Sequence, residues 1–590
     1  MNVNNNRISC ISLSLIAIAV SPIVAFAENT NPRVDAYSAD TWRREQRIID
    51  LHMHIEGEPE RFERAVKIMD AAGIGLGIEL GSGTVTPGEG GISDFERVKQ
   101  VGEEAYPGRF VHYMLMDYDG WDNDDWSTRA VEQINKGHRL GAAGLKEFKR
   151  LGLGLRNGRG ELIEVDDPKL DPVWRRCGEL GMPISIHVGD PKAFWEPLDA
   201  TNERWAELKD HPDWWFGDSE KYPPRMELLK ALERVLARHP ETTFVCVHFG
   251  NNPEDVDWLG EQLDKHPNMM IDLAARIPEI GREDPDKLRA FFIKHQNRIL
   301  FGTDFQVWSR YILGSAGDDE RPTDYEALVF FQKCYHYLET ADRNWVHMTP
   351  IQGDWRISSV NLPSEVQRKV YFDNARKLLA RSYPAPVFRA KRIAVDFEPD
   401  GSLDEDAWSG ALPARIEYAL RDGETHPQLS TSVRALWSNK YLYLAYEAPY
   451  TKLSMAQQPS ENERSGLWED DVVELFVAPN TDQPNDYFEF EWAPNGETLD
   501  VHVDPTEREF AWSGGGESVA VIDRDDKIWR VEARIPLSSL SAKAPVAGAR
   551  WRVNLYRHDN ANGVFLAWHP TLTDTAHAPE RFGWLRFSGD

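Results

Sequence analysis

Eight short apolar runs, each followed by a longer amphipathic or polar stretch, most strongly limit how this chain can fold. The amphipathic stretches, such as residues 61–72, 226–239 and 286–294, have the spacing of helices with one apolar face. Strands that alternate with helices over about 330 residues are typical of a closed parallel (β/α)8 or TIM barrel, an α/β fold. The expected strands are residues 48–51, 74–80, 110–116, 144–148, 184–188, 244–248, 269–273 and 299–302.

Two long inserts interrupt this alternation. Residues 189–224 follow the fifth expected strand, and residues 305–362 follow the eighth. Segments that follow the strands of a parallel barrel lie at its carboxyl end, where such barrels build their active sites. We therefore expect both inserts to lie on the rim of the site and to determine which substrate is bound.

The first 27 residues predict a signal peptide. Arg7 precedes a mostly apolar run, residues 8–26, and Ala25-Phe26-Ala27 offers a small-x-small cleavage site. Serines and Pro22 interrupt the run, which favours a signal peptide over a membrane anchor. No later stretch approaches the ~20 apolar residues of a membrane span. We expect a periplasmic or extracellular protein without stable membrane insertion.

Charge and cysteine content narrow the classes of partner and compartment. The formal net charge of −29 argues against binding to nucleic acid, which is itself a polyanion. Three cysteines remain after the expected cleavage, an odd and sparse set that predicts buried thiols and no disulfide framework; they are Cys177, Cys246 and Cys334.

The pattern changes near residue 384. Residues 384–390 begin with prolines and predict a linker, so that residues 28–383 form the barrel. Beyond the linker, alternation at period two predicts an antiparallel β-sandwich over residues 391–590. The clearest alternating runs are residues 441–446, 472–477, 487–492 and 529–535.

The strongest chemical signal is the run Asp50-Leu51-His52-Met53-His54 at the end of the first expected strand. Side chains two apart on a strand point the same way, so His52 and His54 can bind one ion together. Three further candidates follow strands five, six and eight, at the barrel's carboxyl end; they are His187, His248 and Asp304. Imidazoles with one carboxylate suit zinc or another divalent transition metal.

This constellation resembles that of the amidohydrolase superfamily. The chain is most similar to the metal-dependent branch that groups sugar-acid lactonases, amide hydrolases and aromatic carboxylate decarboxylases. Residues 362–366 and 371–379 also resemble the closing helix of that branch. The resemblance implies that His52, His54, His187 and Asp304 hold one Zn²⁺, that His248 orients or deprotonates the attacking water, and that Asp304 also moves a proton.

Two cationic residues at strand ends could each have more than one role. Many members of the superfamily carry a carboxylated lysine on strand four that bridges two metals, and Lys146 could be that residue. Alternatively, Lys146 binds substrate or pairs with a carboxylate, and the site holds a single metal. Arg276, after the seventh strand, could bind a substrate carboxylate or form an ion pair that holds the rim.

The C-terminal region resembles a family 9 carbohydrate-binding module. The resemblance rests on residues 403–408, 467–476 and 582–587. In that family two tryptophans enclose a terminal sugar, and Trp468 falls on one of those positions. The other position holds Thr575-Ala576-His577, and Trp568 could replace the missing ring. A sandwich that is only structural is the alternative.

Together these features predict a secreted hydrolase that acts on a lactone, ester or amide bond of a carbohydrate-derived substrate through a metal-activated water. The first alternative is a carboxy-lyase that uses the same metal for non-oxidative decarboxylation. The second is a carbohydrate-binding protein with an inactive barrel. The expected partner is a carbohydrate or a small molecule derived from one, and assembly into a homo-oligomer stays open.

Overall fold

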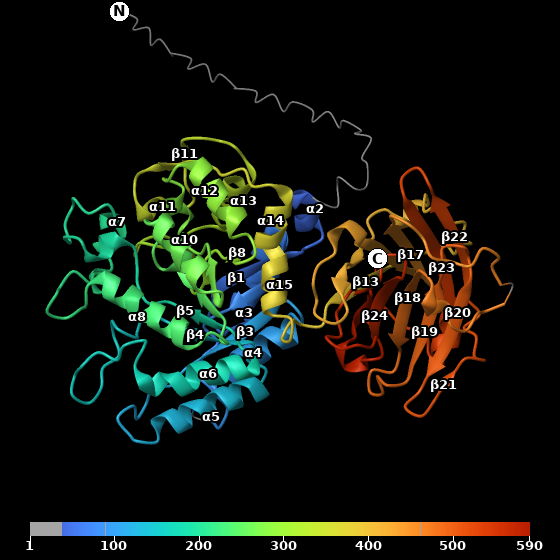
Figure 1. Cartoon of the computed structure of the whole chain (residues 1–590), viewed down its shortest axis with the longest axis horizontal. Coiled ribbons are helices and arrows are strands. Elements are labelled where there is room, and N and C mark those ends of the chain that lie inside the picture. Colours follow the sequence, from blue (N-terminus) through green and yellow to red (C-terminus); the bar gives the residue numbers. More distant parts are fainter. Residues whose placement is uncertain (1–37, 89, 461, 590) are drawn as a thin grey trace, which may run out of the picture.

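The computed structural model describes residues 38–88, 90–460 and 462–589. It places an α/β barrel beside a β-sandwich, joined by the segment between α15 (Asn374–Leu378) and β13 (Val387–Arg392) (Figure 1). The expected signal peptide, residues 1–27, lies outside the described residues. In the described part of the chain, no helix is long and apolar enough to cross a membrane.

Strands β1 to β8 form the barrel, and each pairs in parallel with the next along the chain. All eight lie where the sequence predicts strands. They are β1 (Ile48–Ile55), β2 (Ile74–Glu79), β3 (Phe110–Leu115), β4 (Gly144–Glu147), β5 (Ile184–Ile186), β6 (Phe244–Cys246), β7 (Met269–Asp272) and β8 (Ile299–Leu300).

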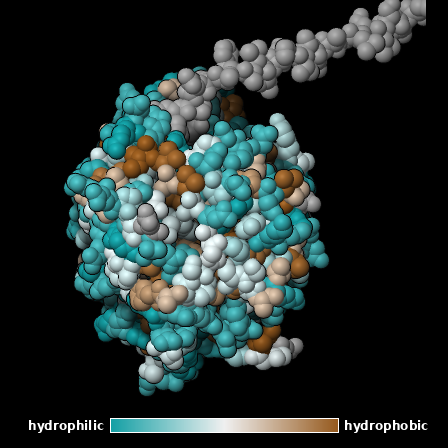
Figure 2. All heavy atoms as spheres, turned by 90° about the vertical axis from the view of Figure 1, so that its right-hand side faces the viewer, coloured by the Kyte–Doolittle hydropathy of each residue, from teal (hydrophilic) through white to brown (hydrophobic). Residues whose placement is uncertain are grey.

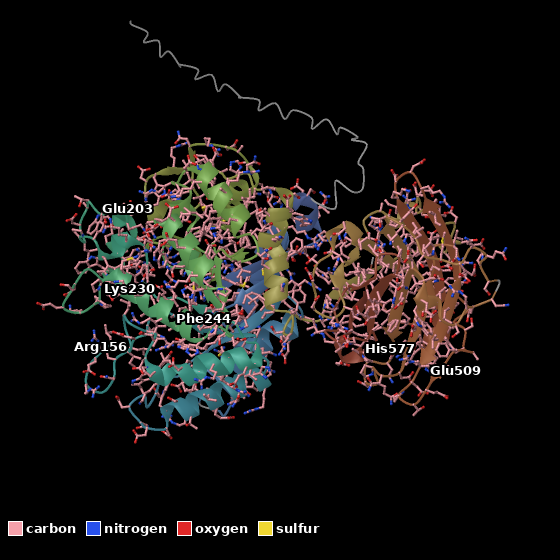
Figure 3. The ribbon with its side chains drawn as sticks, viewed as in Figure 1. Arg156, Glu203, Lys230, Phe244, Glu509 and His577 are labelled. Atoms are coloured by element: carbon pink, nitrogen blue, oxygen red, sulfur yellow. The ribbon has the colours of Figure 1, made fainter. Side chains whose placement is uncertain are left out.

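The barrel closes where the chain after β8 meets β1. The amide of Leu51 donates to the carbonyl of Phe301, and the amide of Asp304 donates to the carbonyl of His52, both at 2.9 Å. β9 (Phe305–Val307) then continues beside β1 in parallel. The closed sheet is a packed core, to which Phe244 of β6 belongs (Figure 3).

One longer helix follows each barrel strand and covers the outside of the sheet (Figure 1). These helices are α3 (Pro59–Ala72), α4 (Asp94–Ala105), α5 (Trp126–Arg139), α6 (Asp171–Leu180), α8 (Arg225–Arg238), α10 (Val256–Lys265), α12 (Pro285–Lys294) and α13 (Asp324–Glu339). Local sequence fixes their starts, since Ser93 and Thr323 form capping boxes with Glu96 and Glu326. The closing segment is α14 (Ser364–Arg368), a π-helical turn (Lys369–Asp373) and α15.

The two long inserts lie together on the carboxyl rim, as the sequence predicts. The first, residues 189–224, contains α7 (Trp205–Leu208), and the second contains β9, β10 (Tyr311–Leu313), β11 (Trp345–Val346) and β12 (Arg356–Ile357). The hydroxyl of Ser315 donates to the carboxylate of Glu207, and His211 Nε2 lies 3.1 Å from the carbonyl of Ala316. Each insert therefore contacts the other.

The C-terminal region is a curled, mostly antiparallel sheet whose two halves face each other across one core. Phe388, Val433 and Leu444 from one half pack with Leu475 and Val553 from the other. The strands are β13, β14 (Ala414–Ile416), β15 (Tyr418–Ala419), β16 (Thr431–Trp437), β17 (Tyr441–Pro449), β18 (Val472–Ala478), β19 (Tyr487–Trp492), β20 (Thr498–Val503), β21 (Arg508–Glu509), β22 (Glu517–Asp523), β23 (Ile528–Pro536), β24 (Arg550–Asp559), β25 (Val564–Ala567) and β26 (Gly583–Phe587).

The end of the sandwich that faces away from the barrel is largely hydrophilic, with apolar side chains in small separate groups (Figure 2).

The free thiols of Cys177, Cys246 and Cys334 are all buried, which confirms the expectation for the cysteines.

The expected linker, residues 384–390, is wrong in its second half. β13 begins at Val387 and pairs with both β16 and β26, so it lies inside the sandwich sheet. Phe388 and Ala390 are buried in the core, whereas Arg389 between them is exposed. Two apolar positions in so short a run give too little alternation to reveal a strand beside the prolines.

Buried charges join the barrel to the sandwich. Glu417, 0% exposed, accepts hydrogen bonds from Arg47 and from Arg368 of α14, the latter at 2.8 Å. Burial alone would raise the pKa of Glu417, but the two guanidinium groups hold that pKa well below its ordinary range. Beside it, Arg376 of α15 lies over the ring of Tyr418 at 3.8 Å. The domains therefore share a polar, tightly paired interface.

Removing the shared carboxylate tests this interface. We expect Glu417→Ala to lower the free energy of unfolding by about 1.5–3 kcal/mol, because Arg47 and Arg368 lose the carboxylate that they share, while Asp373 still pairs with Arg368. The exposed Glu424, in the neighbouring turn, provides a matched Glu→Ala control that should change stability by less than about 0.5 kcal/mol. Urea titration of both variants measures the difference, and equal losses would contradict the assignment.

The lowered pKa also fixes the sign of the pH dependence. The contribution of Glu417 is present above its unfolded pKa and is lost as the pH falls through the folded value. The difference in the free energy of unfolding between wild type and Glu417→Ala should therefore persist at mildly acidic pH.

Candidate functional site

The expected site residues come from four strand ends at one edge of the barrel. Parallel strands meet there at their carboxyl ends, so residues far apart in sequence become neighbours. The residues are His52 and His54 on β1, His187 after β5, His248 after β6 and Asp304 after β8, and all are buried.

Two of these residues have an unusual backbone. His248 and Asp304 lie in the left-handed region, with φ of 56° and 60°. This conformation costs a non-glycine residue of order 1–3 kcal/mol and is concentrated at functional sites. Hydrogen bonds hold both residues in it, since the amide of His248 donates to Asp272 at 2.7 Å and that of Asp304 to His52.

Three side chains converge on one point. Asp304 Oδ1 lies 3.8 Å from His52 Nε2 and 3.5 Å from His54 Nε2. One ligand atom of each residue lies within 4.8 Å of the others, a spacing that an ion could bridge. Two imidazoles and a carboxylate form a donor set that suits zinc or a related divalent ion.

Asp272, the last residue of β7, orients two of the histidines. Its Oδ2 lies 2.8 Å from His52 Nδ1, so the ring turns Nε2 toward Asp304. Its other oxygen accepts the backbone amides of His248 and Ala274. A carboxylate behind a ligating imidazole fixes its tautomer and raises its basicity. Sequence reasoning assigned Asp272 no role, although an acidic residue within an apolar strand was the available signal.

His248 presents one ring nitrogen to the site. Its Nδ1 lies 2.9 Å from the carbonyl of Ala274, which leaves Nε2 as the nitrogen available for proton exchange. The ring centre lies 4.8 Å from that of His52 and 4.3 Å from that of His187. His248 thus borders the converging group.

His187 reaches the same edge but points elsewhere. Its Nε2 lies 3.1 Å from the carbonyl of Gly189 and 3.4 Å from Asp190 Oδ1. In the part of the chain that the structure describes, it is not among the atoms that converge with Asp304. Its expected role as a ligand stays a prediction that requires the ring to turn.

Burial controls the charge of the site. It lowers the pKa of all four histidines, to about 3 for His54 and about 4 for His187, and the ammonium of Lys146 lowers them further. Neutral imidazole is the form that binds a metal. Burial also raises the pKa of Asp304 to about 7 and of Asp272 to about 6. A bound cation would favour the charged form of both carboxylates, so the donor set fits a divalent ion.

The structure separates the two cationic candidates. Lys146 on β4 is fully buried, and its Nζ has no hydrogen-bond partner among the described residues. The charge of Lys146 opposes the rise in the pKa of Asp272 and of Asp304, so its side chain faces the site. Arg276 is instead hydrogen-bonded to Asp190 Oδ1 at 3.4 Å, the ion pair that the sequence left open. Its contact with substrate stays a prediction.

The sandwich presents a different aromatic pair from the expected one. Trp468 is 36% exposed, and its ring centre lies 6.2 Å from that of Phe510, which is 40% exposed. Trp568 is only 7% exposed and packs in the core against Phe388. It therefore offers no open face to a sugar beside Trp468, and that expectation is wrong. His577 packs against Phe476 and Tyr487 (Figure 3).

Comparisons with known proteins agree with both halves of this description. A family model described as "Amidohydrolase" matches residues 49–381, and one described as "Carbohydrate family 9 binding domain-like" matches residues 400–590. A protein of Arthroderma benhamiae named "Extracellular protein" is 25% identical over 184 residues, which are 29% of this chain and 80% of that protein.

Two solved structures are similar to parts of this chain. A family 9 carbohydrate-binding module from Caldicellulosiruptor kristjanssonii, in complex with glucose, is 17% identical and covers 35% of this chain and 97% of its own, with a TM-score of 0.27. A 2,6-dihydroxybenzoate decarboxylase from Rhizobium is 16% identical. It covers 57% of this chain and 98% of its own, with a TM-score of 0.32.

The first family match covers more than half of the chain and includes all five expected site residues. The second confirms the resemblance of the sandwich. The chain belongs to the amidohydrolase family and carries a C-terminal domain that is similar to family 9 carbohydrate-binding modules.

Proposed function

We propose that this chain is a secreted, metal-dependent hydrolase that cleaves a lactone, ester or amide bond of a carbohydrate-derived substrate. The convergence of His52 Nε2, His54 Nε2 and Asp304 Oδ1, with Asp272 behind His52, is the observation that carries the proposal. Membership of the amidohydrolase family supports an enzyme, and the family 9-like domain supports a carbohydrate partner. The apolar N-terminus and the name of the relative support export to the periplasm or outside.

The resident ion in this proposal is one Zn²⁺ per chain. His52, His54 and Asp304 would hold it, joined by His187 once its ring turns from Asp190. When bound, such an ion supplies a Lewis acid that lowers the pKa of water from 15.7 to about 7. A second metal bridged by a carboxylated Lys146 is the alternative.

The protein's own groups supply the proton transfers. His248, with Nδ1 held by the carbonyl of Ala274, can take a proton from water at Nε2 and return it to the leaving group. Asp304 can share this task as a carboxylate beside the site of the ion. The unpartnered ammonium of Lys146 can orient an anionic or carbonyl oxygen of the substrate.

One observation also favours a second candidate, non-oxidative decarboxylation. The buried, unpartnered ammonium of Lys146 would attract a substrate carboxylate as readily as a carbonyl. Product analysis separates the two reactions, because a hydrolase consumes water and releases two fragments or a ring-opened acid, whereas a lyase releases carbon dioxide.

Metal content and turnover can be separated by substitution. We expect His52→Ala to lose the ion, whereas His248→Ala should retain it and lose about 10²–10⁴-fold in kcat. The exposed His138 on α5 provides a matched His→Ala control with unchanged metal and turnover. Elemental analysis with a lactone, ester and amide panel gives both readouts.

Two results would change this assignment. Loss of the ion in His248→Ala would make that residue a ligand. Two ions per chain, both lost in Lys146→Ala, would establish the bridged alternative.

Sugar binding by the sandwich has its own test. We expect Trp468→Ala to weaken glucose binding at least about tenfold, or 1.4 kcal/mol, because its ring is the open stacking face. Phe510→Ala should weaken it less, since that ring supports Trp468 from the side. The exposed Trp308 of the barrel serves as a matched Trp→Ala control in calorimetric titration. Undiminished binding in Trp468→Ala would show that the sugar binds elsewhere.

A further inference from the structure

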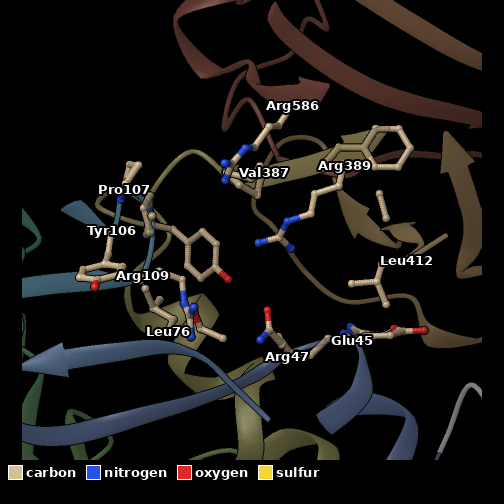
Figure 4. A pocket seen from close by; sticks show the side chains of 18 of the residues that line it. Glu45, Arg47, Leu76, Tyr106, Pro107, Arg109, Val387, Arg389, Leu412 and Arg586 are labelled. Carbon is tan, nitrogen blue, oxygen red and sulfur yellow. The ribbon is translucent and has the colours of Figure 1, made fainter. Parts of the chain in front are cut away.

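A cavity of about 530 Å³ lies between the barrel and the sandwich (Figure 4). Both domains line it, for example through Arg109 of the barrel and Arg389 of β13. None of the five expected metal-site residues borders it. Its volume lies in the range of cavities that bind small organic molecules. This interdomain cavity plays no part in the chemistry proposed above.

The walls of the interdomain cavity are basic, although the chain carries a net charge of −29. Among the described residues, seven arginines and three acidic residues line it, a local excess of 7 − 3 = +4. Some of the arginines are neutralised, since Arg109 pairs with Asp70 and Arg415 with Glu45. An excess of cationic groups in a concave wall concentrates anions there.

Three arginines of the sandwich wall stand side by side. Arg389 lies opposite Arg586 across β13 and β26, and Arg586 lies opposite Arg550 across β26 and β24. No carboxylate of the described residues lies within 4 Å of any of the three. Like charges directly opposite each other destabilise a sheet. All three side chains keep contact with water, which screens part of this repulsion, and a bound anion would relieve the rest.

The arginines face into the interdomain cavity. Arg389 and Arg586 point into it from the sandwich, and Arg109 approaches from the barrel (Figure 4). Partial enclosure by the cavity, then the charges of Arg109 and Arg586, lower the pKa of Arg389, although its side chain keeps contact with water. The three guanidinium groups are thus near enough to repel one another. An anion placed among them would contact both domains.

The remaining wall is aromatic in part. Tyr383 lies in the connection between the domains, borders the cavity and is partly exposed, with Arg376 over one face of its ring at 4.2 Å. Aromatic rings beside guanidinium forks match a ligand that has both an apolar ring face and a carboxylate. The volume also exceeds what a single inorganic oxyanion would fill.

We propose that the interdomain cavity binds a small sugar acid, with its carboxylate against Arg389 and Arg586 and its ring against the open side of Tyr383. The planar guanidinium groups can each donate two parallel hydrogen bonds to one carboxylate. Since both domains contribute contacts, the bound acid also links the barrel to the sandwich.

Calorimetric titration of the full-length protein with glucuronate, glucose and inorganic sulfate tests the proposal. We expect glucuronate to bind more tightly than either of the other two. The double variant Arg389→Gln/Arg586→Gln should weaken glucuronate at least tenfold, whereas Arg524→Gln, which removes an exposed arginine in another turn, should not. The double variant should melt no lower than the wild type, because it removes repulsion and no ion pair.

Four results would overturn the proposal. Equal binding of sulfate and glucuronate would reduce the site to one for free oxyanions. Glucuronate binding that survives in the double variant but is lost in Arg276→Gln would place the acid in the barrel. Equal binding of glucose and glucuronate, lost in Trp468→Ala, would place both on the sandwich surface. Glucuronate binding that the double variant retains also contradicts the proposal, whichever other variant weakens it.

Discussion

The closure of the barrel between β1 and the chain after β8 is the constraint on which the site depends. A buried carboxylate, Asp50, supports the closing hydrogen bonds by accepting the hydroxyl of Thr303 at 2.6 Å and the backbone amides of Thr303 and His52 at 3.1 Å. With the two strands fixed in this way, Asp304 turns into the left-handed conformation and faces the histidines of β1. Burial raises the pKa of Asp50 to about 7, so its hydrogen bonds oppose a substantial desolvation cost.

Sequence reasoning could place the candidate ligands at one edge because strand ends can be read from apolar runs, and parallel strands bring those ends together. The two-residue spacing of His52 and His54 carried most of this information. It missed Asp272 because a residue that acts through hydrogen bonds to other side chains leaves no spacing pattern. It misplaced Trp568 because composition does not tell which face of a sandwich strand packs inward; in the structure that ring lies against Phe388. Substrate identity depends on the inserts, whose shape no periodicity describes.

The interface between the domains was also beyond sequence reasoning. Arg47 lies 370 residues from Glu417 and Arg368 lies 49 residues from it, and each alone resembles an ordinary surface charge. Their burial arises only from docking of the domains, which makes the loss of one partner costly. A fragment that starts at Lys391 would cut β13 and leave Glu417 without both arginines. Separate expression of the sandwich is better begun before Val387, and point substitutions disturb the barrel less than truncation does.

The contact between the two rim inserts has a kinetic consequence. Arg204, buried at 1% exposure, pairs with Glu207 of its own insert and with Glu279 beyond β7, while Glu207 also accepts the hydroxyl of Ser315. One carboxylate thus couples two loops that lie about 100 residues apart in the sequence. Either insert can move alone only by breaking this buried pairing, so a movement that opened the rim would carry both inserts together.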